Sequence, residues 1–121
     1  MISNDGSLAA LLNNKRLAAL ASRGTDWLLD ECHRLAMMLA PGAVSASVRM
    51  THKHSGRDYM VLVEVISQGY GPSDDKAIAS VTVALNSHES ARRVALAVVS
   101  TMLRDKAKAC GIKIPRRPRD A

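Results

Sequence analysis

Apolar residues recur at helical spacing in the first third of the chain. They follow this spacing from Ser7 to Ser22 and resume after Thr25. The second stripe consists of Leu28, Cys32, Leu35 and Leu39. Side chains spaced by three and four residues share one face of a helix. With Gly24 and Pro41-Gly42 as stops, we predict helices over 7–22 and from residue 25 or 26 to about residue 40.

The apolar period then changes to two. Apolar and polar residues alternate from Val44 to Thr51 and again from Tyr59 to Val65, which is typical of strands with one buried face. A turn over 55–58 joins them, and a four-residue loop brings both apolar faces to the same side. We therefore predict an antiparallel hairpin. Its expected pairs are His54 with Tyr59, Met50 with Val63 and Val48 with Val65.

A third strand and a long helix complete the pattern. After a polar loop over 68–75, one face of a strand is expected to consist of Ala77, Ala79, Val81, Val83 and Leu85. Asn86 is a favourable N-cap, and Glu89 follows three residues later as in a capping box. The last helix is expected to end at Gly111.

This order, α-α-β-β-β-α, predicts an α+β fold with helices packed on one face of a three-stranded antiparallel sheet. The 121 residues, of which 47% are apolar, suit one small domain. We assign a flexible N-terminus to 1–6, a single domain to 7–111 and an extended basic tail to 112–121. The residues expected to be buried together are Val48, Val63, Val81 and Val98.

Positive charge is concentrated near the C-terminus. The net charge is +6, and the last eighteen residues contain seven Lys and Arg against two Asp, a balance of +5. The docking residues that we predict in the tail are Lys113, Arg116, Arg117 and Arg119. Such a tail suits a nucleic acid, an acidic protein or an anionic lipid surface, and the alternative is a solvated tail. The three aromatic residues are too few for a single-strand binder that relies on stacking.

Membrane and secretory features are not expected. No apolar run approaches the ~18 residues that a membrane span needs. The segment 1–6 does not resemble a signal peptide, and the two cysteines do not form a secreted disulfide framework. We therefore predict a cytosolic protein or one assembled in a cytosol.

Two histidines are the clearest candidates for metal ligands. His52 and His54 are two residues apart on a strand, so their side chains share a face. A third ligand would have to come from His88 or Cys110. Because the spacing does not require such a ligand, we predict a polar strand end, with neither a metal nor a cofactor.

The chain has no pattern that predicts catalysis. Cys32 and His33 are adjacent in a helix, where their side chains diverge, so Cys32 is expected to be a small core residue. Cys110 is expected near the surface as a candidate reactive thiol. The Asp74-Asp75 pair lies in a polar loop, and no phosphate-binding, zinc-protease or nucleophile-elbow motif is present. We therefore predict that the protein is not an enzyme.

The second predicted strand is apolar on both faces. Met60, Leu62 and Ile66 alternate with residues that are expected to face the core. With helices on one side of the sheet, these three would face water, and exposed apolar patches mark contact surfaces. We predict a subunit contact at Met60, Leu62 and Ile66. The alternative is that the 7–22 helix covers them.

The element pattern resembles the tail-completion, or neck, proteins of long-tailed bacteriophages. The resemblance spans about residues 10–108 and lies in the stretches 35–42, 44–50, 55–57 and 89–96. It implies a non-catalytic virion protein that forms a homo-oligomeric ring joining head to tail. Its implied partners are copies of itself and other neck and tail proteins, assembled in the host cytoplasm.

A second resemblance is to the double-stranded RNA-binding domain, which is also α-β-β-β-α. It lies in the turn 55–59 and in the start of the last helix, 87–96. That family has phosphate-contacting lysines where this chain has His88 and Glu89. We therefore rank a structural assembly subunit first, a nucleic-acid-binding module second and a small regulator of a host protein third.

Overall fold

The structure is a computed structural model that describes residues 15–116. The predicted order of helices and strands and the α+β class are confirmed. The elements are α2 (Lys15–Ala21), α3 (Thr25–Leu39), β1 (Ser45–Ser55), β2 (Asp58–Gln68), the 3-10 turn η1 (Pro72–Asp74), β3 (Lys76–Leu85) and α4 (His88–Ala109). The parts of our predictions that concern 1–14 and 117–121 lie outside the described residues.

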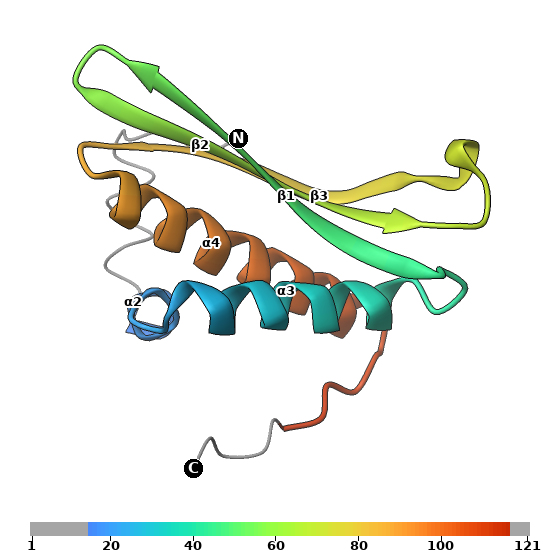
Figure 1. The fold of residues 1–121 in the computed structure, drawn as a ribbon. Coiled ribbons are helices and arrows are strands. Elements are labelled where there is room, and N and C mark those ends of the chain that lie inside the picture. The colour runs from blue at the N-terminus through green and yellow to red at the C-terminus, as the bar shows by residue number, and fades with distance from the viewer. Residues whose placement is uncertain (1–14, 117–121) are drawn as a thin grey trace.

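The sheet forms one layer and the helices form the other (Figure 1). The strand order is β1-β2-β3, and both pairs are antiparallel. α3 and α4 lie side by side under the sheet and run in the same direction, and α2 packs against α4. This arrangement buries one face of the sheet, as the alternating pattern predicted.

The predicted hairpin register is confirmed. His54 lies opposite Tyr59, Met50 opposite Val63 and Val48 opposite Val65. On the helix-facing side of β2, the side chains of Val61, Val63 and Val65 are fully buried. Of the four residues predicted to share the core, Val63, Val81 and Val98 are buried, and Val48 packs against them from the sheet edge.

The alternation predicted for β3 is wrong at its first residue. The register shifts between Val65, which pairs with Ala79, and Ile66, which pairs with Ala77, so Ile78 is an extra residue in β3. Beyond this bulge Ala77 lies opposite Ile66 and is exposed, whereas Ile78 packs against the core. The Lys106 ammonium donates to the Ile78 carbonyl (2.5 Å), which satisfies a backbone group that an extra residue leaves unpaired.

α4 begins one residue later than predicted. Its N-cap is Ser87, not Asn86, and the Ser87 hydroxyl accepts a hydrogen bond from the Ser90 backbone N–H (3.3 Å). Gly111 ends the helix as predicted, with a φ of 75° that favours glycine. The backbone N–H of Ile112 then donates to the Ala107 carbonyl (2.9 Å).

Cys32 is a core residue, as predicted. Its side chain is fully buried, and its Sγ lies 3.7 Å from the Leu96 carbonyl oxygen to which it donates. Burial, and then the charge of Glu31, raise the pKa of the Cys32 thiol to about 12. The thiolate is therefore strongly disfavoured at neutral pH. Cys110, at the end of α4, is exposed.

Val63→Ala should lower the free energy of unfolding by about 1–3 kcal/mol, because it removes methyl groups from a fully buried site. Thr51→Ala, on the exposed side of β1, should change it by less than about 0.5 kcal/mol. Urea unfolding of both variants measures the difference. Equal midpoints would contradict the strand orientation described above.

Candidate functional site

Met60 and Leu62 lie on the face of the sheet that points away from the helices. Leu62 is flanked by Thr51 and Thr82 on the neighbouring strands. Both apolar side chains are half-buried. Within residues 15–116, no helix lies over this face (Figure 1), and α2 packs on the opposite side, against α4. The described part of the 7–22 helix therefore does not cover Met60 and Leu62.

Ile66 differs from its two predicted partners. It is 8% exposed, so it offers little area to another molecule. It lies where the register shifts, between Ser47 on β1 and Ala77 on β3. The surface that sequence reasoning assigned to three residues therefore consists mainly of Met60 and Leu62, which we call the outer patch.

The histidines lie at the free end of the hairpin, which extends past the start of α4. His52 and His54 share a face, as predicted, but they contact different neighbours. His52 Nδ1 lies 2.9 Å from His88 Nε2, whereas the His54 ring packs on Tyr59 with centroids 4.9 Å apart. Among the described residues, no group of three or more side chains is placed to hold a metal ion. The sequence offered His88 as a candidate neighbour of the pair, and the fold brings it to His52.

The His52 pKa lies below its ordinary value of 6.5. The loss of water around the ring has the largest effect, followed by the positive charges of His88 and Arg92. A lowered folded-state pKa means that the unfolded chain binds protons more readily. The resulting stability is fully present above about pH 6.5 and is lost as the pH falls through the folded-state pKa.

His88→Ala should raise the His52 pKa toward its ordinary value, because it removes both a charge and a neighbour that excludes water. A histidine titration by NMR in the wild type and the variant measures this shift. His33, which is exposed on α3, serves as the internal control. An unchanged His52 pKa would show that the contact with His88 does not perturb it.

A buried carboxylate links the two long helices. Glu31 on α3 is 1% exposed and uses both of its oxygens. Arg34 Nε donates to Oε1 (3.0 Å), and Arg104 Nη2, on α4, donates to Oε2 (2.5 Å). A buried carboxylate without partners is costly. The folded state therefore keeps both arginines bonded to Glu31.

The same cluster holds the start of the tail. Arg34 Nη1 donates to the Pro115 carbonyl (3.2 Å), and Ile114 packs against the core. Residues 112–116 form no helix, as predicted, but they are anchored at Pro115. In Figure 1 this segment runs back beneath the helices, on the side away from the sheet. Of the predicted tail residues, Lys113 and Arg116 are described and exposed, whereas Arg117 and Arg119 lie outside the described residues.

A pocket of about 380 Å³ opens between α3, α4 and this segment. We call it the arginine pocket, and its lining residues are Arg23, Trp27, Glu31, Arg34, Arg104, Ile114, Pro115 and Arg116. The Arg23 guanidinium lies over the Trp27 ring, 4.6 Å from its centroid. Sequence reasoning missed this site because its arginines are widely separated in the chain. The spacing of Glu31 and Arg34 was the one local signal.

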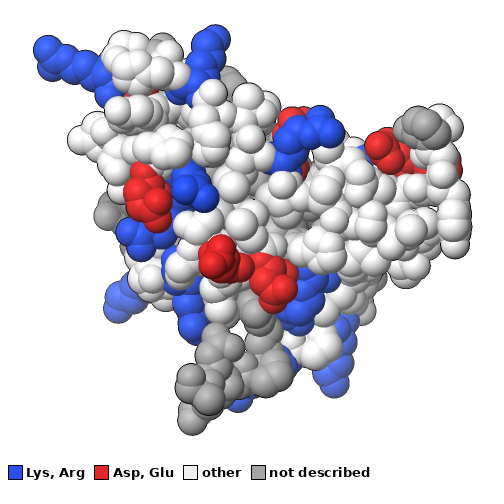
Figure 2. Space-filling view, viewed as in Figure 1, with Lys and Arg blue, Asp and Glu red and all other residues white. Residues whose placement is uncertain are grey.

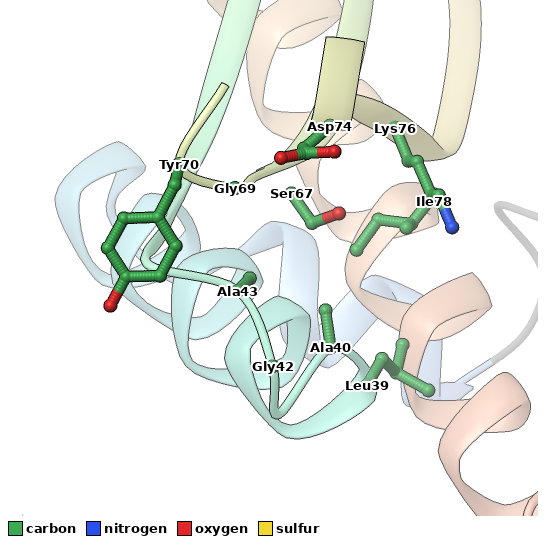
Figure 3. A pocket seen from close by; sticks show the side chains of 10 residues that line it. All are labelled: Leu39, Ala40, Gly42, Ala43, Ser67, Gly69, Tyr70, Asp74, Lys76 and Ile78. Carbon is green, nitrogen blue, oxygen red and sulfur yellow. The ribbon is translucent and has the colours of Figure 1, made fainter. Parts of the chain in front are cut away.

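A second cavity, of about 430 Å³, lies between the end of α3 and the loop that follows β2 (Figure 3). Its two charged lining residues are Asp74 and Lys76. Asp74 accepts a hydrogen bond from the Gly71 backbone N–H (3.1 Å), and a Cβ at Gly69 would lie 2.4 Å from the Asp74 Cβ. The predicted acidic loop therefore uses Asp74 to close a tight turn, in which only glycine fits at position 69.

Lys and Arg side chains occur at more than one place on the surface and are not confined to the C-terminal region. Figure 2 shows Lys and Arg at the hairpin end of the sheet as well as below the helices, with acidic residues between them.

Comparisons with protein-family models, curated proteins and solved structures found no match for this chain. No helix in residues 15–116 combines the length and apolar character that crossing a membrane requires.

Proposed function

We propose that the protein is a non-catalytic structural subunit that assembles with copies of itself. The single observation that supports this best is the outer patch. In the described residues, both long helices lie on one face of the sheet, and Met60 and Leu62 are on the other. A soluble domain with no partner for that face would be expected to have polar residues there.

The resemblance to phage neck proteins supplies the specific form of this proposal. The assembly would be a ring in a virion, between head and tail, with other neck and tail proteins as further partners. A closed ring uses two different surfaces of each subunit. The outer patch is the candidate for one of them, and the edge of β1, which pairs with no further strand among the described residues, is a candidate for the other.

The described cavities also support a role without catalysis. The cavity of Figure 3 holds one carboxylate and one ammonium group, and the carboxylate already bonds to the backbone. The arginine pocket has a carboxylate whose two oxygens bond to arginines. In both cavities the carboxylate is therefore already engaged in bonds that stabilise the fold, and this makes it less available as a general base.

Leu62→Asp should leave the domain folded and weaken self-association roughly a hundredfold, because an unpaired charge at a buried contact costs several kcal/mol. Sedimentation velocity over a range of concentrations measures the association. Ser73→Asp adds the same charge at an exposed position in η1 and should associate like the wild type. Far-UV circular dichroism confirms that each variant is folded.

Three outcomes contradict the proposal. A wild-type chain that stays monomeric at every concentration would refute assembly from copies of itself. A folded Leu62→Asp variant that associates normally would remove the outer patch from the interface. If Leu62→Asp does not fold, Met60→Asp repeats the test at the neighbouring position, and loss of folding in both variants would show that this face is internal.

One observation favours a duplex-RNA-binding module as a second candidate. α3 and α4 run in the same direction on one face of the sheet, and the β1–β2 turn lies at the same end as the start of α4 (Figure 1). However, Glu89 lies 3.9 Å from Arg92 and 3.6 Å from Arg93, which reduces the positive charge at this end. This candidate would be favoured if the protein bound duplex RNA much more tightly than duplex DNA of equal length. The Arg92→Gln variant should then bind the RNA more weakly than the wild type does.

A further inference from the structure

We propose that the arginine pocket and the basic segment at its rim, residues 113–116, bind the phosphate backbone of a nucleic acid. This site lies on the helix side of the molecule, away from the outer patch and from the hairpin end. Nucleic-acid binding there goes beyond the assembly function and does not depend on it. The ligand class follows from the charge, the geometry and the extended shape of the site.

The charge of the pocket is strongly positive. Its lining includes four arginines and one glutamate, so the net charge is +3. Glu31 neutralises only part of this charge, because it shares its two oxygens between Arg34 and Arg104. The side chains of Arg34 and Arg104 are each 24% exposed, so both remain within reach of a ligand. An anion is therefore attracted to the site.

The geometry of the pocket is fixed before any ligand arrives. Glu31 holds a guanidinium from each long helix, and Arg34 also holds the Pro115 carbonyl. This anchor places Arg116 in the lining of the pocket. Planar guanidinium groups bind phosphate oxygens in pairs, and groups that are already oriented lose less conformational entropy on binding.

The extended segment favours a polymer of phosphates over an isolated anion. Lys113 and Arg116 lie on a stretch without helix, and Arg116 lines the pocket. Residues in an extended chain are ~3.3 Å apart, so Lys113 and Arg116 present their charges along a line and not at one point. Trp27 is the one aromatic residue in the pocket, so contacts are expected to be to phosphates and largely independent of sequence.

The test measures binding of the full chain to a fluorescein-labelled 20-base-pair DNA by anisotropy, over a range of salt concentrations. Arg23→Gln/Arg116→Gln removes two charges that do not bond to Glu31. It should weaken binding roughly tenfold at low salt. The slope of log K against log salt should become less steep by about 1.8, because each phosphate that the protein no longer neutralises accounts for ~0.9. Trp27, the only tryptophan, should change its fluorescence when unlabelled DNA binds.

A matched control removes the same charge from the sheet side. Arg49→Gln/Arg57→Gln changes two exposed arginines, on β1 and in the hairpin turn, and should retain most of the salt slope. Equal losses of affinity in the two double variants would show binding by net charge alone and would overturn the proposal. A larger loss of affinity in the control would place the nucleic-acid site at the hairpin end.

Two further outcomes would also overturn it. If polyglutamate of matched charge binds as tightly as the DNA and competes with it, the pocket recognises acidic protein instead. If neither duplex nor single-stranded DNA or RNA binds at low salt, the arginines only stabilise the fold. Sedimentation of Arg23→Gln/Arg116→Gln without DNA should match the wild type, so a failure here is separate from a failure of the assembly proposal.

Discussion

The burial of α4 is the constraint on which the other elements depend. All seven residues from Val94 to Ser100 are buried, and successive residues in a helix point ~100° apart. This stretch of α4 is therefore covered around its whole circumference, by the sheet on one side and by α3 and α2 on the others. Alanines at 91, 95 and 97 let its neighbours approach closely. α4 is thus the central element of the fold, and the sheet packs against one side of it.

This arrangement explains why a carboxylate lies inside the helical layer. Where α3 crosses the second half of α4, the contact is no longer entirely apolar, and Glu31 bonds to Arg34 and Arg104. These bonds fix the spacing of the two helices and hold the chain after α4 through Pro115. Glu31 therefore helps to orient α3, α4 and the segment that follows α4. Because an unpaired carboxylate would destabilise the folded state at this buried position, both arginines are required.

The sequence predicted those features whose signals are local. The hairpin register follows from an alternating pattern on both sides of a short turn. The three predicted pairs were therefore correct: Val48 with Val65, Met50 with Val63 and His54 with Tyr59. The bulge at Ile78 was missed, because neither Ala77 nor Ile78 carries a local sign that a residue will be left unpaired. The N-cap was misplaced by one residue because Asn86 and Ser87 are both good caps. The arginine pocket was missed because Arg23, Arg104 and Arg116 meet only after folding.

The bulge in β3 makes the two edges of the sheet unequal. β1 is paired to β2 without interruption over its whole length, so its outer edge is regular. β3 is distorted at Ile78, and bulges of this kind discourage the addition of a further strand. A strand from another molecule would therefore add more readily at β1 than at β3. If two copies met through β1 in place of the ring contact, both regular edges would be consumed, and the sheet would stop growing instead of extending into a fibre.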